Sequence, residues 1–192
     1  MQLNESLILF FVDIVLGYIP QAAGCAVCLF TIADQRLRSR PFLITTIIYA
    51  VIAMAIRLLY NIGFIDFGFH TIIIWMIFII VAIFYNKLPV MQSTVSILVS
   101  GILITVSEII TAIVLGAIFG AERFNAMMNN TATVQGQIEK AICGIPMNFL
   151  FLIIVLILSL VVKRQRAKKA ALKAQSAEGE ATQEEDADIT EE

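Results

Sequence analysis

The chain has 192 residues, of which 59% are hydrophobic and 15% are charged, whereas an average soluble domain has about 25% charged residues. Its apolar residues form several separate runs, each near the roughly 20 residues that a helix needs to cross a bilayer. This pattern excludes an ordinary soluble domain and predicts an all-α integral membrane protein, with a bundle of five transmembrane helices and a disordered, charged C-terminal tail.

The first predicted helix spans about residues 6–33, which is long for one crossing and too short for two. Pro20 lacks a backbone N–H, so a kink is predicted there. Small residues give this helix faces for close helix contact: Gly17, Ala22, Ala23, Gly24 and Ala26. Cys25 and Cys28 form a CAVC pair, but no second pair exists to complete a metal site, so both are interpreted as packing residues.

Four more helices are predicted, at about residues 42–60, 69–85, 90–119 and 142–162. The polar segment between the last two is predicted to be an external loop that acts as a lid. Residues 1–163 therefore form the transmembrane domain. Residues 164–192 form the tail, which is basic and then acidic and too poor in apolar residues to bury a core, so we expect it to be disordered.

The orientation follows from lysines and arginines in short loops, which favour the cytoplasmic side. Arg36, Arg38 and Arg40 follow the first helix, and Lys87 follows the third. Five crossings place these residues and the basic tail on one side. We therefore expect a multi-pass protein of the plasma membrane, with its N-terminus outside and its C-terminus in the cytoplasm.

Four ionisable residues lie within the predicted spans: Asp13, Arg57, His70 and Glu108. A charge at the centre of a helix costs about 2.5–3.5 kcal/mol on insertion scales, so such residues usually face the bundle interior and pair. At about 1.5 Å per residue, all four fall in the outer half of the membrane. Arg57 is the predicted partner of Glu108, with Asp13 competing for it or sharing it.

Polar neighbours support an interior position for Glu108. Thr105 and Thr111 lie three residues to either side, and a stripe of hydroxyls is predicted to face other helices: Ser93, Ser96, Ser100 and Ser107. Asn148 brings the last helix to the same outer zone. Three interpretations stay open, namely a buried ion pair that fixes helix register, an outward-opening polar pocket for a ligand, and a proton or ion pathway. The pathway is disfavoured because no ionisable residue continues into the inner half. His70 is either an interfacial residue or a ligand contact.

Enzymatic motifs are missing from the sequence. It contains no HExxH, no GxSxG, no glycine-rich phosphate loop and no paired metal-binding carboxylates. We therefore expect no enzymatic activity, no cofactor and no metal. Nucleic-acid binding is not expected either, because the basic run follows a membrane span directly and is itself followed by acids.

Three stretches carry a resemblance to a known family: LGYIPQ, FYNKLPVMQSTVSILVSGILI and SEIITAIVLG. Over about residues 7–163 the chain resembles the membrane sensor half of peptide-pheromone histidine kinases of the accessory-gene-regulator type, from Gram-positive bacteria. The resemblance implies an outward-facing pocket. Those kinases continue into an ATP-binding domain, whereas about thirty tail residues follow here, so a partner protein is expected to carry the signal.

The first functional hypothesis is a sensor-like membrane protein that binds a small ligand or peptide and signals through a cytoplasmic or membrane partner. Its basic tail segment would contact that partner or the lipid surface: Lys163, Arg164, Arg166, Lys168 and Lys169. The alternatives are a substrate-binding membrane subunit of a transporter, with Ala22 and Ala26 against a partner subunit, or a structural assembly factor. A homodimer is compatible with each hypothesis.

Overall fold

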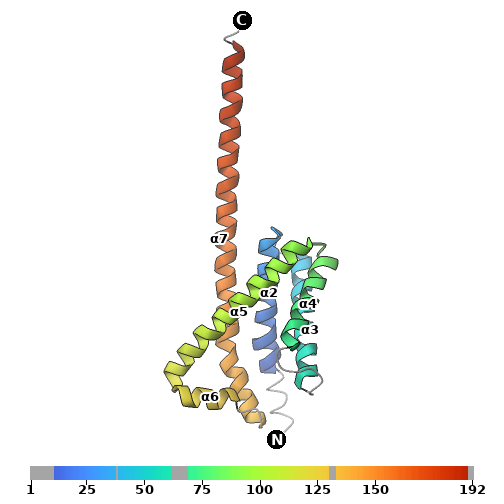
Figure 1. The fold of residues 1–192 in the computed structure, drawn as a ribbon, viewed down its shortest axis with the longest axis vertical. Coiled ribbons are helices and arrows are strands. Elements are labelled where there is room, and N and C mark those ends of the chain that lie inside the picture. Colours follow the sequence, from blue (N-terminus) through green and yellow to red (C-terminus); the bar gives the residue numbers. More distant parts are fainter. Residues whose placement is uncertain (1–10, 38, 62–68, 130–132, 190–192) are drawn as a thin grey trace. The chain divides into compact units, whose positions relative to one another are not determined.

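The computed structural model describes residues 11–37, 39–61, 69–129 and 133–189 (Figure 1), without the side chains of residues 13, 14, 57, 60, 61, 134 and 173–189. All regular structure in these residues is helical, which confirms the all-α prediction for this part of the chain. The elements are the π-helix η1 (Val12–Tyr18) and the α-helices α2 (Ile19–Ile32), α3 (Arg40–Asn61), α4 (Phe69–Phe84), α5 (Val90–Phe119), α6 (Ala121–Asn129) and α7 (Val134–Ile189). They divide into two compact units, Met1–Leu156 and Ile157–Glu192, so α7 belongs to both.

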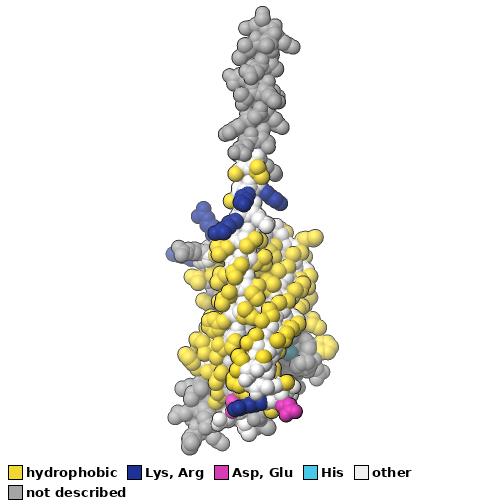
Figure 2. Space-filling model, turned by 90° about the vertical axis from the view of Figure 1, so that its left-hand side faces the viewer, with side chains coloured by type: hydrophobic (Ala, Val, Ile, Leu, Met, Phe, Trp, Pro, Cys, Tyr) yellow, Lys and Arg dark blue, Asp and Glu magenta, His cyan; other side chains and the backbone are white. Residues whose placement is uncertain are grey.

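Three helical stretches of the described chain are long and apolar enough to cross a membrane: Val15–Ile32, Val90–Phe119 and Gln135–Leu172. Two shorter apolar stretches, Arg40–Ile56 and Phe69–Phe84, fall below that length. Hydrophobic side chains cover the sides of the helices in Figure 2. The structure therefore supports the membrane class, while the number of five crossings stays a prediction.

The second, third and fourth predicted helices agree closely with α3, α4 and α5. The prediction of a loop after α5 was wrong, because α6 and the start of α7 occupy that segment and α7 begins at Val134 rather than near residue 142. Phe124, Met127 and Met128 recur with helical spacing and are half-buried, so even this polar segment has one apolar helix face. Gly120 separates α5 from α6 with φ of 85°, a conformation that glycine adopts more readily than other residues.

Pro20 marks a change of helix type. Residues 12–18 form the π-helix η1, and Pro20 lies in the first turn of α2. A proline has no N–H to donate to a carbonyl of the preceding turn, so the ladder of η1 cannot run regularly into α2. The irregularity that the sequence predicts at Pro20 is thus present as a junction between a π-helix and an α-helix.

The core of the first unit is centred on α2, which packs against α3 and α5. Ten of the fourteen residues of α2 are buried, against seven of the thirty of α5, so α2 is central and α5 is peripheral. The largest fully buried side chains come from five helices: Leu29, Phe30, Tyr49, Ile97, Phe151 and Val155 with the nearly buried Phe78. Gly24 allows the ring of Phe151 to lie directly against α2, because a Cβ at this position would overlap that ring.

The second unit is the continuation of α7, which stays helical to Ile189. The sequence predicts disorder here because the segment cannot bury a core. The same segment is rich in Ala, Lys, Glu and Gln, which have high helix propensity. High helix propensity favours such a helix locally, and the disorder of the tail stays a prediction.

Candidate functional site

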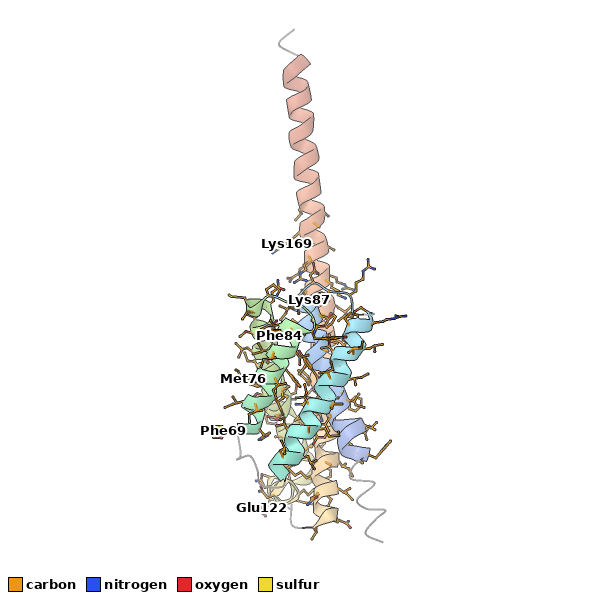
Figure 3. The ribbon with its side chains drawn as sticks, turned by 90° about the vertical axis from the view of Figure 1, so that its right-hand side faces the viewer. Phe69, Met76, Phe84, Lys87, Glu122 and Lys169 are labelled. Carbon is orange, nitrogen blue, oxygen red and sulfur yellow. The ribbon has the colours of Figure 1, made fainter. Side chains whose placement is uncertain are left out.

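The two ends of the first unit differ in charge. Figure 3 shows Lys87 and Glu122 at opposite ends. Thr45 near the start of α3 donates a hydrogen bond to Asn86 (2.9 Å between Oγ1 and Oδ1), which places the loop of Arg36 and the start of α3 beside Lys87. We call these the Lys87 end and the Glu122 end.

Buried polar side chains lie in both halves of this unit, and three of them lie in the half that is nearer the Glu122 end. Asn148 of α7 is 7% exposed, Thr111 of α5 is 8% exposed and Ser107 is fully buried. Tyr18, the last residue of η1, is buried as well. Three elements, η1, α5 and α7, thus contribute polar groups to the interior of this half.

Asn148 lies against the π-helix. Its Nδ2 is 4.0 Å from the position that a Cβ on Gly17 would take, and the carbonyl oxygen of Val12 is 3.9 Å from the same point. The Asn148 Oδ1 atom is buried, and the described residues offer it no hydrogen-bond donor. An unsatisfied buried acceptor costs about 1–3 kcal/mol, so this amide is a candidate binding group.

The hydroxyl stripe of α5 is buried as the sequence predicts, since Ser93, Ser96, Ser100 and Ser107 are all 1% exposed or less. Each hydroxyl donates to the carbonyl four residues earlier, for example Ser100 to Ser96 at 2.8 Å. These bonds satisfy the hydroxyls within the helix, so the stripe packs without needing polar partners on other helices.

Cys25 and Cys28 lie in the core at 5% and 2% exposure. The Cys28 thiol donates to the Ser96 carbonyl at 3.5 Å, and the Ser100 side chain interacts with both thiols. The interpretation as packing residues is confirmed. Among the described side chains, no three of His, Cys, Asp and Glu come together in a group that could hold a metal ion.

Glu108 lies on the exposed side of α5, and so does Thr105, whereas Thr111 is buried. The predicted interior position of Glu108 is therefore wrong, and the predicted common face of the three residues is divided. Six residues turn an α-helix by about 600°, so Thr105 and Thr111 point about 120° apart. Glu108 lies angularly between them.

Two predicted members of the charged cluster are only partly described. Asp13 lies in η1 and Arg57 in α3, but their side chains lie outside the described residues. The predicted pairing of Glu108 with Arg57 and Asp13 therefore stays a prediction. His70 is half-buried in the first turn of α4, with its Nε2 3.2 Å from Thr71 Oγ1.

A groove between α4 and α5 was not predicted. It holds about 370 Å³ and is lined by Trp75, Leu98, Gly101, Ile102 and Thr105. The Trp75 ring lies over Gly101, where a Cβ would be 2.5 Å from Cζ2. The single tryptophan of the sequence was the available signal, but only the fold shows that it faces a glycine 26 positions later.

The predicted membrane-surface residues belong to the second unit. Lys163, Arg164, Lys168 and Lys169 are exposed, and Arg166 is half-buried. They follow the apolar part of α7 without a break in the helix. The segment therefore presents cations directly after an apolar stretch.

Comparisons with known proteins give no relative. No protein-family model matches the chain, and no similar protein is found among curated proteins or solved structures.

Proposed function

We propose that the chain is a non-enzymatic, multi-pass plasma-membrane protein of the sensor or receptor kind, which binds a small ligand or peptide in its outer half. Its five apolar helical stretches cross the bilayer, with the N-terminus outside and the C-terminus in the cytoplasm. A cytoplasmic or membrane partner carries the signal onward.

The surface of the first unit supports a lipid environment. Large aliphatic side chains are exposed along α3, α4 and α5, among them Leu43, Met76, Ile102 and Ile113. Contiguous apolar surface of this kind marks contact with a membrane or a partner. At one end Arg36, Arg40 and Lys87 outnumber Asp34, whereas at the other end Glu122 and Glu139 are balanced by Arg123 and Lys140. This difference fits the rule that lysines and arginines favour the cytoplasmic side.

The observation that carries the proposal is the buried amide of Asn148 beside η1. Isolated polar groups inside a membrane bundle are expensive and usually functional. Short π-helical segments are also frequent at functional sites. Here the two coincide in the half nearer Glu122, the half that faces outward in the proposed orientation.

The burial of Ala22 and Ala26 counts against one argument for the transporter alternative. That alternative expects small residues such as these to contact a partner subunit, but both are buried within the chain's own core at 2% and 0% exposure. These two residues therefore contact other helices of the same chain, and little of their surface is left for a partner subunit.

The basic segment from Lys163 to Lys169 has two roles in this proposal. Near an anionic leaflet each Lys or Arg contributes about 1 kcal/mol of attraction, which holds the end of the span at the cytoplasmic surface. The exposed remainder of the segment is the contact for a signalling partner.

The test uses membranes that contain the protein and the small-molecule and peptide fraction of medium from the producing organism. Ligand binding raises the melting temperature of a protein by mass action. We expect the fraction to raise that of the wild type but not that of Arg57→Ala, with equal membrane levels of both proteins. If Arg57→Ala collapses the membrane level instead, the charged cluster is structural and the receptor proposal fails.

Copurification distinguishes the receptor proposal from the transporter alternative. Recovery with a kinase or another signalling protein agrees with a receptor. Recovery with an ATPase module and a scaffold subunit would favour transport instead.

A further inference from the structure

We propose that α6 (Ala121–Asn129) is a membrane-surface helix that lies along the boundary between the lipid headgroups and the acyl chains. Its apolar face, formed by Phe124, Met127 and Met128, is the surface that contacts lipid. This inference goes beyond the proposed function, because it needs neither a ligand nor a signalling partner.

The residues of α6 are separated by polarity around the helix axis. Phe124, Met127 and Met128 fall within an arc of about 100°, and all three are half-buried. The polar residues lie outside this arc and are exposed: Glu122, Arg123, Asn125 and Asn129. A helix with one apolar and one polar face is the kind that lies in the plane of a membrane interface.

The length of α5 brings the start of α6 to the membrane surface. The thirty residues of α5 extend over about 45 Å, and a bilayer with its headgroups is about 40–45 Å thick. Gly120 then turns the chain with φ of 85°, and α6 runs in a new direction from the end of α5 (Figure 1). A straight continuation would carry the apolar face of α6 into water, whereas the turn leaves it at the boundary.

The exposed apolar surface of α5 continues up to α6. Ile118 and Phe119 are 67% and 43% exposed, and only Gly120 separates Phe119 from Ala121. Exposed apolar side chains at the end of a membrane-length helix contact acyl chains, so the same chains reach the first turn of α6. The half-buried residues of α6 retain apolar surface for this contact.

Apolar burial rather than charge attaches α6 to lipid. The formal charges of Glu122 and Arg123 cancel, and α6 has no other charged residue. Anionic leaflets attract clusters of lysine and arginine, which α6 does not have. We therefore expect α6 to lie at the same depth in zwitterionic and in anionic membranes.

The test places a tryptophan on either face of α6. Trp75→Phe first removes the single tryptophan of the sequence. In that background, Phe124→Trp puts an indole on the apolar face, and Asn125→Trp is the matched control on the polar face. The full-length variants are reconstituted in phosphatidylcholine vesicles whose acyl chains carry bromine either near the headgroup or near the chain end. Iodide on both sides of the vesicle reports contact with water, because bromine and iodide each quench indole fluorescence on contact.

We expect Phe124→Trp to lose more fluorescence to bromine near the headgroup than to bromine near the chain end or to iodide. Asn125→Trp should lose most to iodide, and vesicles that also contain anionic lipid should give the same order. Three results overturn the proposal. Iodide dominates at both positions if α6 lies in water, as a lid would. Phe124→Trp is protected from every quencher if protein alone covers the apolar face. Bromine near the chain end quenches most if α6 is inserted in the hydrocarbon core.

If Trp75→Phe does not fold, spin labels supply the same test with Trp75 in place. The labels are attached at Met127→Cys on the apolar face and at Ala126→Cys on the polar face, in a variant whose three native cysteines are replaced by alanine. Oxygen, which concentrates among acyl chains, should relax the label at Met127→Cys more than a water-soluble nickel chelate does, with the reverse order at Ala126→Cys. Any other order overturns the proposal.

Discussion

The contact between Trp75 and Gly101 gives the sharpest test of helix packing. A Cβ at residue 101 would lie 2.5 Å from Trp75 Cζ2 and 2.6 Å from Cη2, whereas carbon atoms in contact prefer about 3.5–4.0 Å. Gly101→Ala therefore forces α4 and α5, or the indole ring, about 1 Å apart. Overpacking of this kind costs about 1–3 kcal/mol.

Gly116→Ala is the matched control on the same helix, because a Cβ there meets nothing within 4 Å. Both substitutions gain the same helix propensity of about 1 kcal/mol, so their difference isolates the steric cost. At about 2–4 °C per kcal/mol for a chain of this size, Gly101→Ala should melt about 2–12 °C below Gly116→Ala. The assay is the loss of the folded peak in size-exclusion chromatography after heating in detergent.

Trp75→Leu should remove most of this difference, because the clashing ring atoms are then missing. Combining Trp75→Leu with Gly101→Ala makes a double-mutant cycle, which measures the coupling of two residues in contact. Equal melting temperatures of the two alanine variants, or a difference that persists in the Trp75→Leu background, would refute the packing of α4 on α5.

Three further predictions concern the core and the turn after α5. Tyr49→Phe removes the 3.0 Å hydrogen bond to the Phe78 carbonyl but keeps the stacked rings; it should cost about 0.5–1.5 kcal/mol, and an unchanged melting temperature would contradict the bond. Cys25 and Cys28 are buried, so maleimide should label them only after denaturation, and fast labelling in native membranes would contradict the core position of α2. Gly120→Ala strains a residue with φ of 85° and should destabilise by about 1–3 kcal/mol; a neutral effect on the melting temperature would contradict this turn.

The helix boundaries that could be predicted well from the sequence are those marked by a proline or a glycine. Pro89 immediately precedes α5 and Gly120 immediately follows it, and the thirty residues between them are apolar apart from Glu108 and the hydroxyl and amide groups. The burial of the serine stripe was predictable for a similar reason. Its spacing of three and four residues puts the hydroxyls on one helix face, and such a face avoids lipid.

The missed features depend on contacts between distant residues. The Trp75 groove exists because α4 places its indole over Gly101, and no local pattern relates the two positions. The different surroundings of Thr105 and Thr111 depend on which side of α5 faces α2 and α4. The unpartnered Oδ1 of Asn148 arises from the approach of α7 to η1, and the sequence indicates only that a polar residue lies at that depth.

Helix α6 was missed because it is short and its composition is polar. Its nine residues include Glu122, Arg123 and two asparagines, which by composition indicate a loop. Phe124, Met127 and Met128 are half-buried because the chain turns at Gly120, so that α6 runs in a new direction from the end of α5 (Figure 1).

The central claim is that the Lys87 end faces the cytoplasm and the Glu122 end faces outward, with the polar interior at Asn148 in the outer half. Single cysteines at exposed positions of the two ends test it in intact cells, in a variant whose three native cysteines are replaced by alanine. The account predicts that a membrane-impermeant maleimide labels Glu122→Cys in intact cells and labels Arg36→Cys only after permeabilisation. Labelling of Arg36→Cys in intact cells, with Glu122→Cys protected, would contradict it.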